Sequence, residues 1–255
     1  MSNVKIGHAS ISERGTVNGE KGDSTKREVC TRDWYDKEWD FMAIHPDSTV
    51  REKHAKAIEA ACANNNIGYG QNTRNTLYPL AKAAKYDLSK ITEKCNCDCS
   101  SLQNVCAVAS GANGVTYGSN GWTTSNMKTK LKAAGYVIIE KSEYLKSADY
   151  CVRGAIYVKA GSHTVCGLTN GSKASKTLSA AGVSSCSTTA KATYFDKCAY
   201  TGTSITEALK SIGVENSKEY RKKIAKANSI TGYTGTAAQN TKMLNLLKKG
   251  KLIKP

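Results

Sequence analysis

The sequence lacks any apolar run close to the roughly 20 residues that a helix needs to cross a bilayer. Its first residues, MSNVKIGHAS, lack the apolar segment of a secretory signal peptide. We therefore expect a protein without membrane insertion that is made in a cytosol. Acidic residues are also scarce: 21 Asp and Glu stand against 37 Lys and Arg, which leaves a formal net charge of +16. This excess predicts a polyanionic partner, such as nucleic acid, an anionic membrane or an anionic cell-wall polymer.

Proline is rare as well, and glycine and proline together make up only 24 of the 255 residues. That share excludes a low-complexity chain, and 40% hydrophobic residues argue against global disorder. The ten cysteines are about 4% of the chain, which is below the density of a disulfide scaffold. Reduced thiols, a metal site and a catalytic thiol therefore all stay open. The length suits one large domain or two small ones, each able to bury a core.

Periodicity and turn residues predict helices followed by short strands. Thr49 and Glu52 have capping-box spacing at the start of the first helix, and Gly111 is a plausible stop for the third, which starts near Cys99 or Ser100. The predicted helices lie near 49–62, 75–85, 99–110 and 125–134, and the predicted strands at 136–140, 154–159 and 163–168. This order predicts an α+β fold and not a regular βαβ alternation.

Residues 173–193 are small, polar and without periodicity, which predicts a linker between a domain at 1–172 and a module at 194–255. Three capped helices are expected in the module, with Ser204, Asn216 or Ser217, and Thr236 as the caps. Thirteen Lys or Arg and four Asp or Glu lie at 191–255, which therefore carries +9 of the net +16. A solvated helix face explains such charge, and nucleic-acid binding is the alternative, although no DNA- or RNA-binding motif accompanies it.

Three cysteines stand close together in the run CNCDC at 95–99. They could be buried thiols that pack as small hydrophobic groups. A metal site needs four ligands, but cysteines spaced by one residue with no histidine pair nearby fit that poorly. The nucleophile interpretation fits Cys99 best. A cysteine in the first turn of a helix meets the positive end of the helix dipole and free N–H groups, which favour the thiolate.

A thiolate nucleophile needs a base, for which histidine is the usual residue. The chain has only four histidines. His45 is expected in a loop, His54 on the surface of the helix at 49–62, and His8 near the start of the chain. His163 opens a predicted strand after a glycine-containing turn, where its ring could project from the edge of a sheet. We therefore expect His163 to be the base.

Two segments resemble the NlpC-type papain-fold cysteine peptidases, DCSSL at 98–102 and RGAIYVKAGSHTVCGLTNG at 153–171. In that family a cysteine at a helix start follows Asp and precedes Ser, and a histidine opens a later strand. The resemblance implies a papain-like fold with helices packed on a small antiparallel sheet, with Cys99 as nucleophile, His163 as base and no metal or other cofactor. The Gly-Asp pair that usually precedes the strand is Gly154-Ala155 here.

The third polar residue of that family lies on the next strand, often within a His-Ala-Ser run, but nothing after Gly171 supplies one. GHASISERGTV at 7–17 resembles the missing strand, and EVCTRDWYDKEWDFMAI at 28–44 resembles the segment that follows it. We therefore predict a circularly permuted domain in which the strand of His8 lies beside the strand of His163. His8 would then orient the His163 ring. The alternative is a frayed His8, with another polar side chain in that role.

The stretch 1–170 also resembles phage and prophage peptidoglycan amidohydrolases, through GHAS, GEKGDSTKREVC, IGYGQNTRNTLY and CDCSSL. This implies attack by Cys99 on a stem-peptide amide, either as an endopeptidase after D-glutamate or as a muramoyl-L-alanine amidase. It makes Tyr69 a candidate to lie over the site. Asp98 and Ser100 become candidate substrate contacts, with capping and packing as the alternative. The loop that begins GEKGDST lacks the ending of a nucleotide loop and is expected at the substrate rim.

The C-terminal module resembles modules behind lytic domains in clostridial and phage wall hydrolases, which implies attachment to anionic wall polymers. The whole chain is thus predicted to be an endolysin-type hydrolase for bacterial peptidoglycan, with a Gram-positive host, release from the host cytoplasm through a holin lesion, and no nucleic-acid partner. A non-catalytic basic protein that binds cell walls or nucleic acid is the alternative from another class.

Overall fold

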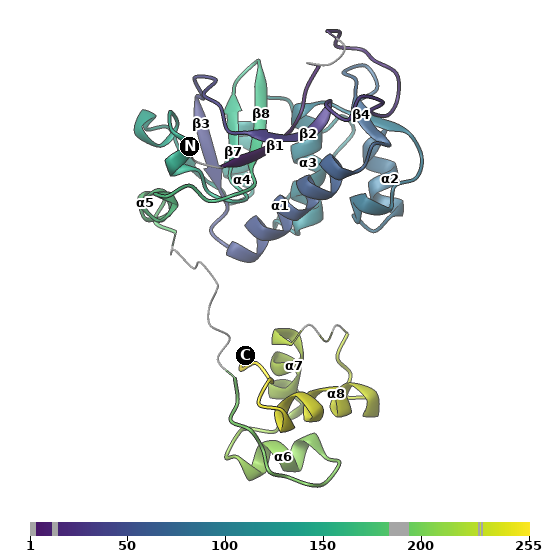
Figure 1. Ribbon diagram of the computed structural model, residues 1–255, viewed down its shortest axis with the longest axis vertical. Helices are drawn as coiled ribbons and strands as arrows, with labels where there is room; N and C mark the ends of the chain where they lie inside the picture. The colour runs from purple at the N-terminus through teal and green to yellow at the C-terminus, as the bar shows by residue number, and fades with distance from the viewer. Residues whose placement is uncertain (1–3, 12–14, 184–193, 229, 231) are drawn as a thin grey trace. The chain divides into compact units, whose positions relative to one another are not determined.

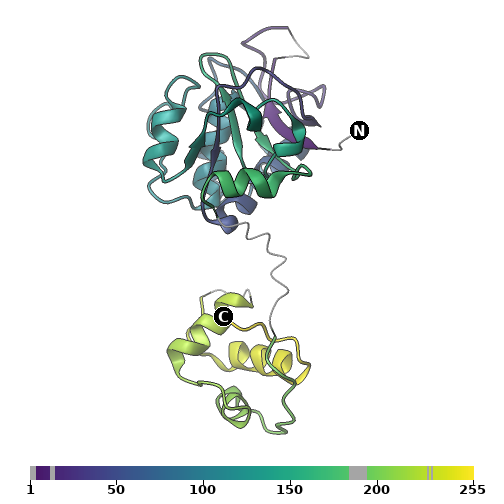
Figure 2. The same ribbon diagram turned by 90° about the vertical axis from the view of Figure 1, so that its left-hand side faces the viewer.

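The computed structural model describes residues 4–11, 15–183, 194–228, 230 and 232–255 (Figures 1 and 2). The chain divides into two compact units, Met1–Ser185 and Cys186–Pro255. The first combines helices with a small antiparallel sheet, and the described part of the second is helical, so the predicted α+β class is confirmed. No helix among the described residues is long and apolar enough to cross a membrane.

The first unit is built around a six-stranded sheet of order β2-β1-β8-β7-β3-β6, in which each neighbouring pair is antiparallel. Its strands are β1 (Lys5–Ala9), β2 (Val29–Asp33), β3 (Phe41–Ile44), β6 (Val137–Ile139), β7 (Ile156–Lys159) and β8 (His163–Gly167). A separate parallel pair joins β4 (Ile67–Tyr69) to β5 (Cys95–Cys97). The three strands predicted after residue 135 are present. The predicted pairing of the strand that carries His8 with the strand that carries His163 is also present, as β1 beside β8.

The helices of this unit are α1 (Ser48–Ala63), α2 (Leu77–Ala83), α3 (Cys99–Ser110), α4 (Met127–Ala133) and α5 (Ala174–Ala180). Helices α1 and α3 pack against each other and against β1 and β8, beside the sheet in Figure 1. The predicted stop of α3 is confirmed, because Gly111 is its C-cap in the left-handed conformation with φ of 76°.

Alternation along the strands places apolar side chains on both faces of the sheet. In β8, Cys166 packs on the side of α1 and α3, whereas Val165 packs on the opposite side with Leu178 of α5. Close packing of α1 depends on Gly7 in β1, where an added Cβ would lie 2.3 Å from Cγ2 of Ile58. The glycine beside His8 therefore lets helix α1 approach the strand that carries the histidine.

The start of α1 differs from the prediction. The helix begins at Ser48 with Asp47 as its N-cap, whose carboxylate accepts the N–H of Thr49 at 2.7 Å. The capping box predicted from Thr49 and Glu52 is therefore wrong, because aspartate is an equally good cap two residues earlier. In α2, Pro79 falls within the first turn, where its missing N–H costs no helical hydrogen bond.

The predicted linker also differs from the structure in its first half. Residues Ala174–Ala180 form α5, and Ala174, Leu178 and Val183 are buried against the sheet. This short helix has too few apolar residues to show a clear hydrophobic periodicity. Its packing against the sheet therefore explains its position better than its own sequence pattern does. The rest of the predicted linker, 184–193, lies outside the described residues.

The second unit contains, within its described residues, the three helices α6 (Ile205–Ser211), α7 (Lys218–Ala227) and α8 (Ala237–Lys248). Ser204, Ser217 and Thr236 cap them, each accepting the N–H of the residue three positions later. The helices enclose a separate apolar core that includes Ile205, Leu209, Ile224, Met243, Leu244 and Leu247. The three helices and their caps are as predicted.

Candidate active site

Cys99 is the first residue of α3, and a capping box fixes it there. The Asp98 carboxylate accepts the N–H of Ser101 at 2.7 Å, and the Ser101 hydroxyl accepts the N–H of Asp98 at 2.8 Å. Helix α3 packs on β8, and the backbone N–H groups of Thr164 and Ser100 lie close enough to the Cys99 sulfur to lower its pKa. The thiol therefore lies beside the residue that follows His163, with only 6% of Cys99 exposed.

The ionisation of Cys99 differs from the expectation for a helix start. Burial raises the pKa of the thiol to about 12, and the Asp98 carboxylate acts in the same direction. The N–H of Ser100, in the first turn of α3, lowers the pKa as predicted, and the N–H of Thr164 in β8 also lowers it, but desolvation outweighs both. The thiol is therefore neutral near pH 7, and a nucleophilic role would require a base to remove its proton.

His163 and His8 meet across the pair formed by β8 and β1. Nε2 of His163 lies 3.2 Å from Nδ1 of His8, and the rings meet edge to face with centroids 5.4 Å apart. His8 is 1% exposed and lies within a strand, so the frayed alternative is wrong. Because Nε2 of His163 faces His8, Nδ1 is the ring nitrogen left for a thiol.

Both rings are neutral at pH 7. Burial lowers the pKa of His163 to about 4, and the nearby charges of Lys37 and Arg32 lower it further. Burial lowers the pKa of His8 to about 3, with His163 and Arg32 acting in the same direction. A neutral His163 has a lone pair and can accept a proton, as a general base must.

Aromatic side chains enclose the two rings. Trp39 stacks on His163 with centroids 6.3 Å apart and planes 29° apart, and Tyr35 meets His8 edge on at 6.4 Å. The Trp39 indole N–H donates to the carbonyl oxygen of Tyr35 at 3.2 Å, which joins the two aromatic residues. Packing against these rings restricts rotation of both histidines.

A cavity of about 420 Å³ opens at His163. It is lined by Ser10, Ile11, Val17, Arg32, Tyr35, Lys37, Tyr69, Gln71, Ser162 and His163. The predicted residue Tyr69 therefore lies in the same cavity as the predicted base. Although Tyr69 is far from Cys99 in sequence, the register of β4 and β5 pairs it with Cys97, two residues before the thiol. Tertiary pairing thus brings Tyr69 to the site.

Asp98 and Ser100 lie at the start of α3, where Arg74 binds both. Nε of Arg74 lies 2.9 Å from Oδ2 of Asp98, and another Arg74 nitrogen donates to the Ser100 hydroxyl at 3.1 Å and to the carbonyl oxygen of Trp122. The Ser100 hydroxyl in turn donates to Asp98 at 3.1 Å. These contacts match the capping and packing roles that were predicted as the alternative to substrate contact for Asp98 and Ser100. Neither residue lines the cavity at His163.

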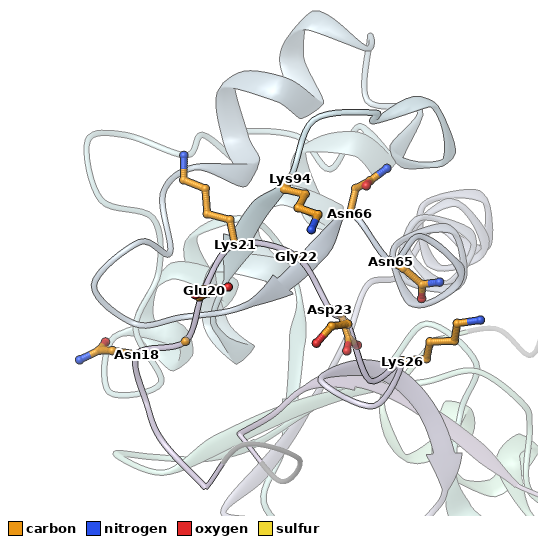
Figure 3. A pocket seen from close by; sticks show the side chains of 11 residues that line it. Asn18, Glu20, Lys21, Gly22, Asp23, Lys26, Asn65, Asn66 and Lys94 are labelled. Carbon is orange, nitrogen blue, oxygen red and sulfur yellow. The ribbon is translucent and has the colours of Figure 1, made fainter.

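The glycine-rich loop at 18–24 lines a second cavity of about 650 Å³ (Figure 3). The Asp23 carboxylate holds the loop by accepting the N–H groups of Glu28 at 2.8 Å and Val29 at 3.1 Å. Lys21, Lys26 and Lys94 project separately in Figure 3 and do not converge on one point. Val17 lines the cavity at His163 and its neighbour Asn18 lines the second cavity.

The other two histidines lie elsewhere. His54 is 1% exposed, and its Nε2 lies 2.8 Å from Oε1 of Gln103 in α3. The predicted surface position of His54 is therefore wrong, because α1 packs against α3 on that side. Nδ1 of His45 accepts the N–H of Asp47 at 3.1 Å.

The cysteines of the described residues are nine free thiols, and Cys95 and Cys97 are completely buried in β5. Burial raises the pKa of both of these thiols. Within the same residues, no three His, Cys, Asp or Glu side chains gather as a metal site would require. The contacts of Cys95 and Cys97 are therefore those of buried structural thiols.

Several residues at the site had no role predicted from the sequence. Cys30, Arg32, Tyr35, Lys37 and Trp39 all belong to the segment at 28–44, which sequence resemblance placed after the His8 strand without assigning functions. The sequence feature that could have indicated these residues is the high density of cationic and aromatic residues in TRDWYDKEW. Only the antiparallel pairing of β2 with β1 brings that cluster to the histidines.

Comparison with known proteins gives one family. The family model described as the endolysin-like domain matches residues 6–174, which include α3, β8 and all of β1 except Lys5, and so His8, Cys99 and His163. No curated protein and no solved structure matches the chain.

Proposed function

Since the chain belongs to the endolysin-like domain family, whose name describes lytic enzymes of the bacterial cell wall, we propose that it hydrolyses an amide of the peptidoglycan stem peptide through Cys99. In this proposal His163 is the base and His8 orients it. One observation carries the proposal: α3, which begins with Cys99, packs on β8, which begins with His163, and Nε2 of the neutral His163 lies 3.2 Å from Nδ1 of His8. The proposed nucleophile, base and orienting residue lie on α3, β8 and β1, and these three elements contact one another.

The reaction follows from the protonation states. Nδ1 of His163 takes the thiol proton while the sulfur attacks the amide carbonyl carbon, which leaves an oxyanion and an imidazolium. Nε2–H of the imidazolium donates to Nδ1 of His8, which stabilises the charge. The first turn of α3 has N–H groups without helical acceptors, and the N–H of Cys99 is the donor proposed for the oxyanion.

Collapse of this intermediate breaks the C–N bond, and the imidazolium gives its proton to the leaving amine. Water then attacks the thioester, with His163 again taking a proton. The carboxylic acid leaves, and the proton returns to the sulfur. The cycle balances without a metal ion or an oxidant, and it needs the neutral form of His163 in both halves.

The charge of the cavity suits a peptide that carries carboxylates. Arg32 and Lys37 line the cavity with His163, and both lower the pKa of that ring, so their positive potential reaches the site. Peptidoglycan stem peptides are anionic, which makes them suitable occupants. An endopeptidase that cuts after D-glutamate and an amidase that cuts muramoyl–L-alanine remain the two forms of the proposal. Mass spectrometry of the released muropeptides distinguishes these two activities, because the new termini identify the cleaved bond.

The domain itself is proposed to be an NlpC-type papain-like peptidase in permuted order. The support is that β1, the first strand of the chain, lies next to β8, the last strand of the sheet in sequence. In the proposed arrangement, β1, which carries His8, lies beside β8, which carries His163, but precedes it in the chain. Tyr69, Asp98 and Ser100 are proposed substrate neighbours, with Tyr69 the best supported because it lines the cavity.

The second unit is proposed to attach the enzyme to anionic polymers of a Gram-positive wall. It has its own apolar core, and 13 of the 37 Lys and Arg lie at 191–255. Tethering would raise the concentration of the enzyme at its insoluble substrate after release from the host cytoplasm. Residues 186–255 alone should bind purified walls and be released by salt. Binding that salt leaves unchanged would contradict a charge-driven contact.

The test of the catalytic proposal is Cys99→Ala, with Cys106→Ala as the matched control. Cys106 is a fully buried thiol in the same helix, so both variants lose a buried sulfur from α3. We expect Cys99→Ala to abolish clearing of purified cell walls and Cys106→Ala to retain it. If Cys99→Ala clears walls as fast as the parent, hydrolysis does not depend on Cys99 and the catalytic proposal fails. If the parent itself does not clear walls, the non-catalytic, wall-binding alternative is favoured.

A further inference from the structure

The hydrogen-bond chain behind His163 continues beyond His8. Cys30 in β2 is the register partner of His8 in β1, and its sulfur lies 3.6 Å from Nε2 of His8. The same sulfur lies 3.0 Å from the carbonyl oxygen of Arg27. A carbonyl oxygen can only accept, so the single thiol proton of Cys30 is donated to Arg27. The sulfur lone pairs then face His8 and accept its Nε2–H.

The direction of this bond sets the directions of those that follow. A neutral imidazole carries one ring proton, and in His8 that proton is on Nε2, which leaves Nδ1 as an acceptor. Nδ1 of His8 therefore accepts Nε2–H of His163 across the 3.2 Å contact. Because His163 is also neutral, its Nδ1 has no proton and presents a lone pair. The opposite direction would put the His163 proton on Nδ1 and leave no base for Cys99.

We propose that Cys30 is a positioning residue that fixes the tautomers of His8 and, through it, of His163. The effect on rate rests on the proposed function, whereas the tautomers exist without substrate and are measured independently of activity. A thiol suits this place because it donates to Arg27 and accepts from His8 at the same time. Sulfur is a weak acceptor, but it acts here within a chain of hydrogen bonds that polarise one another.

Tautomers can be read directly in the full chain. With only four histidines, selective ¹⁵N labelling gives a simple imidazole spectrum in which protonated and unprotonated ring nitrogens differ clearly. We expect His8 and His163 to be Nε2–H tautomers at pH 7. His45 is an internal reference, because its Nδ1 accepts the N–H of Asp47 and it is therefore Nε2–H in every variant.

The test variant is Cys30→Ala, with Cys30→Ser as the conservative replacement and Thr31→Ala as the control on the same strand. Cys30 is only partly buried and Thr31 is exposed, so these substitutions leave the core intact. Cys30→Ala should convert both His8 and His163 to mixed tautomers. Cys30→Ser keeps a donor and an acceptor and should restore the parent spectrum, which Thr31→Ala should not alter.

The kinetic consequence is a lower kcat at unchanged KM on a soluble stem-peptide substrate. Cys30→Ala should lower kcat about tenfold, the equivalent of one hydrogen bond, with partial recovery in Cys30→Ser. Unchanged imidazole spectra in Cys30→Ala would overturn the proposal, and so would mixed tautomers at undiminished kcat. Failure of the proposed function itself would give a different result, namely full clearing of walls by Cys99→Ala. The imidazole spectra would still show whether Cys30 fixes the tautomers of His8 and His163.

Discussion

The acid limit of catalysis should lie well below the ordinary pKa of histidine. The proposed base, His163, can accept a proton only when neutral, and burial together with Lys37 and Arg32 lowers its pKa from 6.5 to about 4. A lowered pKa means that the neutral form persists as the pH falls below 6.5 and is lost only as the pH passes through about 4. Wall hydrolysis should therefore continue at acidic pH values where a solvent-exposed histidine would be protonated.

The size of the effect follows from the titration of one group. At pH 5.5, a base with a pKa of about 4 is roughly 97% neutral, whereas a base with a pKa of 6.5 is roughly 9% neutral. The ratio predicts about a tenfold higher kcat/KM at pH 5.5 than an unperturbed histidine would allow. On the alkaline side, kcat/KM should not increase near pH 8–9, because burial raises the pKa of Cys99 to about 12 and the thiol stays protonated there.

The assay is the pH profile of kcat/KM on a soluble stem-peptide substrate, for the parent and for Lys37→Gln. Removing the charge of Lys37 removes one cause of the low pKa, so the acid limit should move to higher pH. It should stay below 6.5, because burial is the largest cause and remains. An acid limit at pH 6–7 in the parent would refute the reasoning. A shift to lower pH in Lys37→Gln would contradict the assigned sign of the charge effect.

Three further predictions concern the same unit. His8→Ala should lower kcat by at least tenfold at constant KM, because His163 loses the acceptor that stabilises its imidazolium; unchanged turnover would remove His8 from the site. Arg74→Ala leaves the Asp98 carboxylate buried without its cation and should cost about 3 kcal/mol of unfolding free energy in urea titrations. By contrast, Lys90→Ala, which removes the exposed Lys90–Asp87 pair, should leave the unfolding midpoint close to that of the parent. Stability should also fall between pH 6.5 and pH 4, by at most about 4 kcal/mol per pH unit, because His8, His54 and His163 are neutral when folded and take up protons when unfolded; a flat profile would contradict their lowered pKa values.

Local signals in the sequence were sufficient to place Cys99 at the start of a helix. A capping aspartate, a cysteine in the first turn and a glycine stop act within a few residues of one another, so Cys99 and the bounds of α3 could be predicted. The same holds for the β-branched strands and for the three capped helices of the second unit. Prediction failed where tertiary contacts determine the structure. Helix α5 is buried against a sheet formed from distant segments. His54 is buried because α1 packs on α3.

The sequence by itself therefore determined the chemical groups, the elements that carry them and the family to which residues 6–174 belong. Only the tertiary structure decided how those groups are arranged and ionised. The antiparallel pairing of β2, β1 and β8 aligns Cys30, His8 and His163 in one hydrogen-bond chain across 155 residues of sequence separation. Burial then reverses the expected ionisation of Cys99 and keeps both histidines neutral. The reason is physical: desolvation and hydrogen-bond direction depend on what surrounds a side chain, and that environment is assembled from segments far apart in the chain.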